Sequence, residues 1–160
     1  APGVNDMPGK WVFKTTPDGS ENPVQAMTIY NNGRVVCDKG QQNLAVSRTA
    51  TADGTGTGLI EEGTSHVTIT SSNVNYVITL PSPIPGTQIT LVTGATGCEL
   101  WASGSSVKIN DVISSATNEL ALVADRHFHC ECISATEWIV RGFTNLGANM
   151  AATALVPNAR

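Results

Sequence analysis

The sequence predicts an all-β protein, an antiparallel β-sandwich or small barrel with an extended N-terminal arm. In Asn73–Leu80 and in Gln88–Thr93 apolar side chains recur at every second position, which is the period of a half-buried strand. Between these stretches, Pro81–Gly86 contains three prolines and cannot continue a central strand. From about Gly58 onward, turn signals recur at intervals of roughly 8–12 residues, a spacing typical of all-β domains.

The composition favours the same class and excludes others. Charged residues make up 14% of the 160 residues, against roughly 25% in an average protein. The net charge is −4 and no basic block is present, so no nucleic-acid partner is expected. No apolar run approaches the ~20 residues of a membrane span, so no membrane partner is expected. The first ten residues lack the features of a signal peptide, and a mature form that has lost one stays an alternative.

Residues 1–56 are expected to form an N-terminal arm that contains a β-hairpin. Residues 1–10 are rich in Pro and Gly, and we expect no fixed structure for them alone. Trp11–Lys14 is a short strand candidate, and Pro17-Asp18-Gly19 is typical of a turn. Val24–Tyr30 is the next strand candidate.

The hairpin itself is expected at Thr28–Asp38. Asn31-Asn32-Gly33 separates the apolar run before it from Arg34–Cys37 after it. An Asn-Gly step tolerates the positive φ that tight hairpin turns require, so this is a strong local signal.

A domain boundary is predicted at Thr51–Gly58. This stretch has three glycines among small polar residues, and Lys39–Ala50 before it is polar and weakly patterned. Such a segment is typical of a flexible linker or a long surface loop. A phosphate-binding loop is not expected, because neither glycine-rich phosphate motif is present and no helix is signalled afterwards. The predicted division is an arm at 1–56, a compact β-domain at 57–145 and an extended C-terminal tail at 146–160.

The compact domain should consist of short strands joined by turns. Strands are expected at Thr64–Thr70, Asn73–Leu80, Gln88–Thr93, Cys98–Ala102, Val107–Asn110, Leu120–Ile133 and Glu137–Phe143. Val112–Asn118 is expected to be a loop. Ala135-Thr136 allows a tight hairpin that pairs Glu131–Ser134 with the strand after it. The Ala-rich tail has no periodic apolar face long enough for a helix, and we expect it to be ordered only by a neighbour.

One strand carries the residues that most resemble a chemical site. His127, His129 and Glu131 share one face, and the only other histidine is His66, in the Thr64–Thr70 strand. If those strands pair, the three His could approach one another as metal ligands or support acid–base chemistry. The alternative is a polar strand face that meets solvent or an interface, and we favour it. Phe128, Cys130 and Cys132 are expected on the opposite, buried face.

The four cysteines are expected to be buried free thiols, since free Cys behaves as a small hydrophobe. Cys130 and Cys132 form a close pair, but the chain offers no second pair for a zinc site. A disulfide that joins Cys37 or Cys98 to one of this pair stays an alternative.

Other residues give no catalytic constellation. The chain has no GxSxG nucleophile elbow, and the adjacent Glu61 and Glu62 would face opposite sides of a strand, unlike a glycosidase pair. Trp11, Trp101 and Trp138 raise carbohydrate binding, although the aromatic content is only 5%. The alternative for these tryptophans is closure of a sandwich edge or a subunit interface. The sequence therefore predicts no enzyme, and it assigns no catalytic, cofactor-binding or metal-ligating residue.

Several turn and core motifs between Gly58 and Phe143 together resemble a known module. These are Leu80-Pro-x-Pro-x-Pro-Gly86, Thr96-Gly-x-Glu-Leu100, Ile109-Asn110 and Cys132-x-Ser-Ala-Thr-x-Trp138. They resemble a β-rich module of small virion structural proteins of tailed bacteriophages. Within that group, they most resemble the capsid decoration (cement) proteins. The arm shares no motif with that module.

The resemblance implies a structural virion protein on the outer surface of the capsid. Such a protein binds across major-capsid-protein junctions, stabilises the head, and is often a homotrimer with an N-terminal arm on the shell. We expect the contact residues around Trp11–Phe13 and in the tail. The alternatives are a head-fibre or tail-associated adhesin that binds a host receptor, and a secreted carbohydrate-binding module.

Overall fold

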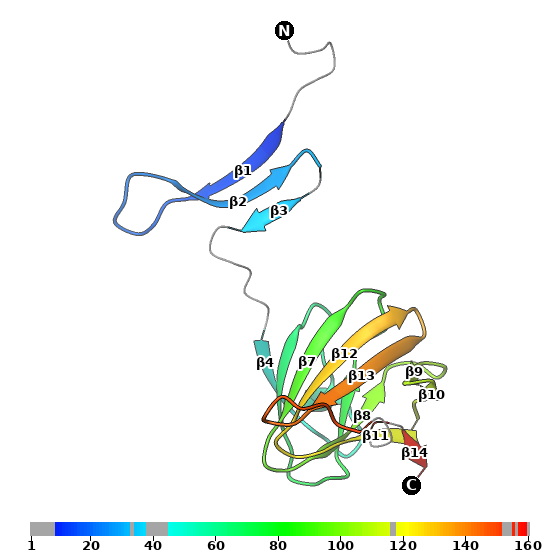
Figure 1. Cartoon of the computed structure of the whole chain (residues 1–160). Coiled ribbons are helices and arrows are strands. Elements are labelled where there is room, and N and C mark those ends of the chain that lie inside the picture. The colour runs from blue at the N-terminus through cyan, green and yellow to red at the C-terminus, as the bar shows by residue number, and fades with distance from the viewer. Residues whose placement is uncertain are drawn as a thin grey trace. The chain divides into compact units, whose positions relative to one another are not determined.

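The computed structural model describes residues 9–32, 34–37, 45–115, 118–151, 155 and 157–159. The chain divides into two units, Ala1–Gln42 and Asn43–Arg160. Both are built from strands, and the one named helical element is a 3-10 turn, η1 (Gly56–Gly58) (Figure 1). The all-β class is therefore confirmed. The boundary lies earlier than residue 57, because a strand at Ala45–Thr49 pairs within the second unit.

The first unit, the arm, is an antiparallel sheet in the order β1-β2-β3. Its strands are β1 (Lys10–Thr15), β2 (Val24–Tyr30) and β3 (Val35–Cys37). The turn expected before β2 is present: the N–H of Ser20 donates to the carbonyl of Pro17 at 3.0 Å. The expected hairpin is confirmed by the β2–β3 pairing, although its Gly33 and Asp38 lie outside the described residues.

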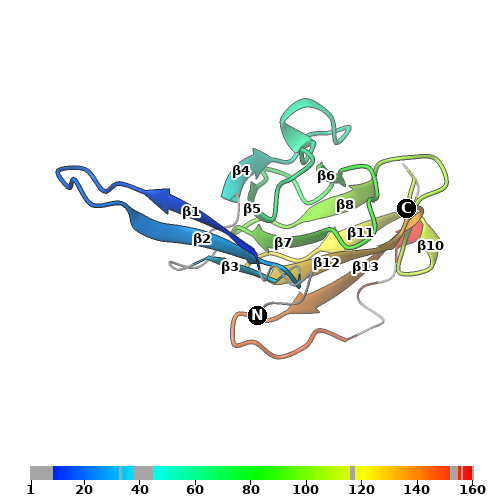
Figure 2. The same ribbon diagram turned by 90° about the horizontal axis from the view of Figure 1, so that it is seen from above.

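The second unit, the compact unit, is a sandwich of a seven-stranded and a four-stranded sheet (Figure 2). The larger sheet has, in spatial order, β10 (Val112–Ile113), β9 (Lys108–Ile109), β13 (Glu137–Phe143), β12 (His127–Ser134), β7 (Gln88–Thr93), β5 (His66–Thr70) and β4 (Ala45–Thr49). The smaller sheet has β14 (Asn158–Ala159), β11 (Asn118–Leu122), β8 (Cys98–Ala102) and β6 (Val77–Leu80).

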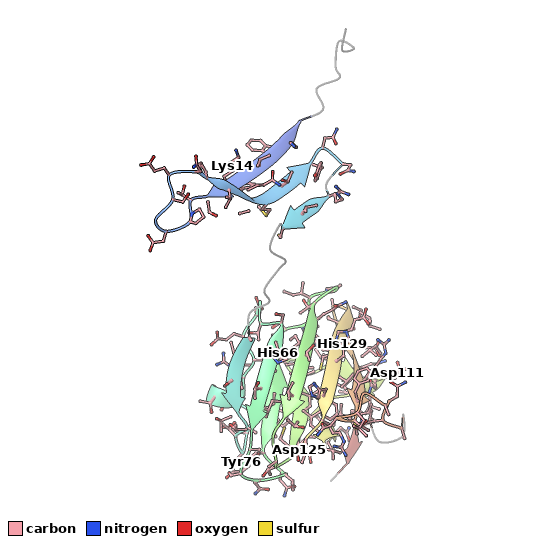
Figure 3. All side chains as sticks on the ribbon, turned by 60° about the vertical axis from the view of Figure 1, so that its left-hand side comes forward. Lys14, His66, Tyr76, Asp111, Asp125 and His129 are labelled. Atoms are coloured by element: carbon pink, nitrogen blue, oxygen red, sulfur yellow. The ribbon has the colours of Figure 1, made fainter. Side chains whose placement is uncertain are left out.

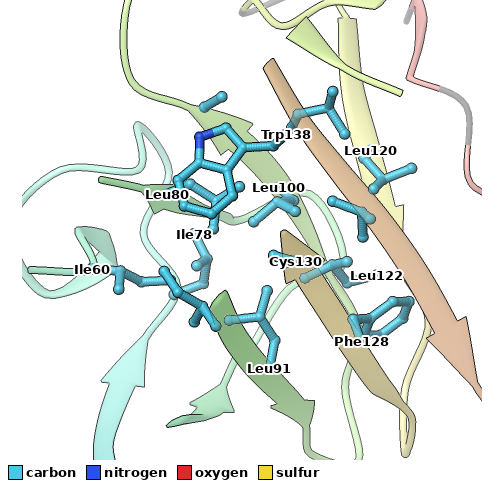
Figure 4. Close-up of a cluster of buried hydrophobic side chains, with 14 of the residues drawn as sticks. Ile60, Ile78, Leu80, Leu91, Leu100, Leu120, Leu122, Phe128, Cys130 and Trp138 are labelled. Carbon is cyan, nitrogen blue, oxygen red and sulfur yellow. The ribbon is translucent and has the colours of Figure 1, made fainter. Parts of the chain in front are cut away.

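The core lies between these two sheets, where β7, β8, β12 and β13 bury alternate side chains. Leu91, Cys130 and Trp138 come from the larger sheet, and Leu100 and Leu120 from the smaller one (Figure 4). The predicted hairpin of β12 and β13 is confirmed, with a bulge near its turn. These inward rows follow the two-residue period that the sequence displays.

The expected sandwich is confirmed, and its sheets are mixed rather than purely antiparallel. The pairs β4–β5, β5–β7, β6–β8 and β9–β13 are parallel. From β5 to β8 the chain crosses from one sheet to the other after each strand. Alternate strands therefore return to the same sheet in the same direction and become parallel neighbours. Turn spacing alone does not distinguish such a crossing from a local hairpin.

The strand expected at Asn73–Leu80 begins only at Val77, because residues 73–76 form a turn closed by a 3.1 Å bond from the N–H of Tyr76 to the carbonyl of Asn73. All four residues of β6 are buried. The face away from the core is covered by the segment around Gly54, whose carbonyl accepts a 2.7 Å bond from the Thr79 hydroxyl. A Cβ at Gly54 would lie 2.4 Å from that hydroxyl, so glycine is required there.

The extended run expected at Leu120–Ile133 is two strands in different sheets, β11 and β12. The chain turns between them at Asp125, which has a φ of 51°. Thr93 of β7 holds this corner: its hydroxyl donates to the carbonyl of Val123 at 2.7 Å and accepts from the N–H of Arg126 at 3.0 Å. The apolar pattern does not reveal the corner, because the segments before and after it have the same two-residue period.

The described part of the tail packs on its own compact unit, which corrects the expectation that it needs a neighbour. Leu155 is buried, and β14 pairs with β11. Asn110 at the β9–β10 turn anchors this packing, because its side-chain NH₂ donates to the carbonyls of Leu155 and Val140 at 2.6 and 3.0 Å.

We predict that Trp138→Ala destabilises the compact unit by about 3–5 kcal/mol, the usual cost of truncating a buried tryptophan. Trp138 is 0% exposed, whereas Trp11 on the arm is 74% exposed. Trp11→Ala is the matched control and should change the free energy of unfolding by less than about 0.5 kcal/mol. Urea unfolding followed by circular dichroism measures both. Equal effects of the two substitutions would contradict the assignment of the core.

Candidate functional site

The arm carries an apolar face on one side of its sheet. Residues directly opposite in an antiparallel pair point to the same side, and the register places six such residues together. This arm face consists of Trp11, Phe13, Met27, Ile29, Val35 and Cys37. No charged residue is among the six, so the arm presents a continuous apolar and aromatic surface.

Within the arm itself, no described element covers the arm face. Trp11 is 74% exposed, Val35 54% and Phe13 47%, and none of the six residues is buried. Among the described residues of the arm, only Thr28 is buried, and it lies on the opposite face between Val12 and Val36. Exposed apolar patches of this kind mark interaction sites in soluble proteins.

The β1 edge of the arm sheet is protected against strand addition. Lys10 and Lys14 stand near the two ends of β1, and the register of β1 with β2 shifts between Phe13 and Lys14. Lysines and bulges at an edge disfavour pairing with a further strand. At β1 the arm is therefore suited to binding through its face rather than through its edge.

The polar face of β12 is confirmed on the outer side of the seven-stranded sheet. Phe128, Cys130 and Cys132 are buried, whereas His127 is exposed and His129 partly exposed. Glu131 forms an ion pair with Arg141 of β13 at 3.3 Å. This arrangement matches the favoured interpretation of a polar strand face.

The histidines are not brought together. His66 of β5 and His129 of β12 both pair with Thr90, so the whole of β7 lies between them (Figure 3). Two strand spacings separate their backbones by about 9–10 Å. Within the described ranges, no group of three or more His, Cys, Asp or Glu side chains is placed to hold a metal ion.

All four cysteines are free thiols and the alternative disulfide is not formed, but the expected burial is wrong for Cys37. Cys98, Cys130 and Cys132 are buried, and Cys37 is partly exposed on the arm face. Burial, with the Glu99 carboxylate as a lesser cause, raises the pKa of Cys98 to about 12. Burial also raises the pKa of Cys130 and of Cys132.

The remaining candidates have structural partners. Glu61 forms an ion pair with Arg48 of β4 at 3.1 Å. The indole N–H of Trp101 donates to Glu119 at 2.7 Å. Trp138 is a core residue. Of the arm face, the sequence singled out only Trp11 and Phe13. Met27, Ile29 and Val35 were missed as surface residues because only the register shows that they share one side.

Comparison of the chain with protein-family models, curated proteins and solved structures finds no match. In the part of the chain that the structure describes, no helix has the length and apolarity to cross a membrane. The function is therefore argued from the geometry and from the sequence resemblance.

We predict that a thiol reagent at pH 8 modifies only Cys37 rapidly in the folded protein. The raised pKa of Cys98 keeps its thiol protonated at this pH, and the thiolate is the nucleophile. In denaturant all four thiols should react. Mass spectrometry of the labelled protein gives the sites, and Cys37→Ser is the control that should abolish the rapid phase. Rapid modification of Cys130 without unfolding would contradict the packing.

Proposed function

We propose that this chain is a non-enzymatic structural protein of a virion, a capsid decoration protein on the outer surface of a phage head. In this proposal it binds across junctions between major-capsid-protein subunits and stabilises the shell. The arm face is the observation that carries the proposal, because it is an apolar surface on a separate unit that no other described element of the arm covers.

The chemistry of the arm face suits a protein partner. It combines two aromatic side chains with Met, Ile and Val, and aromatic residues and Met are enriched in protein interfaces. Full burial of one large apolar side chain contributes roughly 1.5–3 kcal/mol. Several such side chains on one face could together support a stable contact, after the cost of association is subtracted.

The compact unit supports a different part of the proposal. Its core is complete without the arm, since the buried core residues all come from Ala50 to Leu155. A decoration protein needs such an independently folded body together with a segment that binds the shell. The motifs that resemble phage virion modules lie in this body. They are the reason for proposing a virion rather than another protein assembly.

A homotrimer is part of the proposal. Among the described strands, β4 is an edge of the seven-stranded sheet with alternate residues exposed, whereas β6, an edge of the four-stranded sheet, is already bonded to Thr51 and Ile60. Exposed edges favour association, and a closed ring about a symmetry axis covers them without growing a fibre. A three-fold ring of this kind would place three arms around one capsid junction.

We predict that removal of residues 1–14 abolishes binding to capsid shells and leaves the compact unit folded. The truncation deletes Trp11 and Phe13 from the arm face. The paired change Trp11→Ser and Phe13→Ser should weaken binding by at least about tenfold, as expected for central aromatic contacts. The assay is co-sedimentation of the purified chain with shells of the major capsid protein from the same genome.

Val12→Ser is the matched control for the arm. Val12 lies between Trp11 and Phe13 in the chain but on the opposite face of the sheet, so this variant should bind like the native chain. Undiminished binding of the truncated chain would rule out the arm as the docking element. Failure of the intact chain to bind any shell would reject the capsid role itself. Sedimentation equilibrium of the same variants tests the trimer.

A further inference from the structure

A groove that the capsid role does not use lies on the outer face of the four-stranded sheet. Trp101 points into it from β8, because its neighbours Leu100 and Ala102 face the core. The segment from Asp53 to Leu59 and the turn from Ser103 to Ser105 also line it. The groove has a volume of about 490 Å³, within the range of small-molecule sites.

The indole of Trp101 is held in a fixed orientation. Its N–H donates to Oε1 of Glu119 at 2.7 Å, and Glu119 is only 5% exposed. Glu119 stands opposite Trp101 on the neighbouring strand β11, in line with the pairing of Leu120 and Leu100. Since the only polar atom of the ring is engaged with Glu119, the ring offers carbon surface to the groove.

Leu59 and Ala102 add apolar surface to the lining, and its other side chains are polar and carry no cation. Asp53 accepts bonds from the Thr55 N–H at 3.1 Å and the Thr51 hydroxyl at 3.2 Å. The Thr55 N–H is the chief cause that lowers the pKa of Asp53, so the carboxylate stays ionised at neutral pH. The described lining adds serine hydroxyls at Ser103 and Ser105 and contains no Lys, Arg or His. An anionic ligand would therefore meet a negative charge.

We propose that this groove binds a neutral sugar ring. A pyranose has an apolar C–H face, which can stack on the indole of Trp101, and hydroxyls at its rim. An ionised carboxylate has about four acceptor sites, so Asp53 can accept from sugar hydroxyls in addition to its two present donors. The serine hydroxyls of the Ser103–Ser105 turn can donate or accept at the same rim. This inference does not depend on the capsid role.

The test is titration of the ¹⁵N-labelled chain with glucose, galactose, mannose, N-acetylglucosamine, maltotriose and cellotriose. The Trp101 indole N–H resonance should shift saturably with at least one of these sugars. The indole of Trp138 is buried and serves as an internal reference that does not shift. Glucuronate, an anionic sugar, should bind more weakly than glucose.

Two variants and one control complete the test. Trp101→Ala should weaken binding at least about tenfold, as for other central aromatic contacts. Ser105→Arg fills the groove from an exposed turn position and should also abolish binding, with the unfolding midpoint unchanged. Trp11→Ala should bind normally. The proposal is overturned if none of the six sugars shifts the Trp101 resonance, or if binding survives both groove substitutions.

Discussion

The structure depends on one constraint: each sheet of the compact unit must bury one face against the other sheet. Trp138, Cys130 and Leu91 can be buried only because Leu100 and Leu120 approach from the opposite layer. The connections serve the same packing. Thr93 holds the corner where the chain leaves one sheet for the other. Asn110 links Val140 of β13 to Leu155 of the returning tail.

The arm does not satisfy this constraint by itself. Its three strands place Trp11, Phe13 and Val35 on one side, and the described part of the arm has no second layer to cover them. A small sheet needs packing against another element for independent stability. The function that we propose for the arm, docking on a protein shell, would supply the missing layer. The uncovered apolar face of the arm is thus the physical reason for its proposed role in docking.

The sequence predicted what depends on local pattern. The all-β class, the turn at Pro17-Asp18-Gly19, the Asn-Gly hairpin and the β12–β13 hairpin all come from short-range signals. Prediction from the sequence failed for features that tertiary contacts determine. The parallel pairing of β5 with β7 requires knowing that β6 crosses to the other sheet. The arm face can be predicted only when the strand register is known. The Trp101 groove can be predicted only when Glu119, 18 residues along the chain, is known to lie across from Trp101.

Hydrogen–deuterium exchange of the purified chain tests the central claim most directly, since that claim is that the arm lacks a core of its own. Exchange reports the local free energy of opening. We expect the amides of β1, β2 and β3 to exchange rapidly in the monomeric chain, while those of β5, β7 and β12 are strongly protected. The arm amides should become protected when the chain binds its shell. Arm amides as protected as those of β7 in the free monomer would contradict the claim.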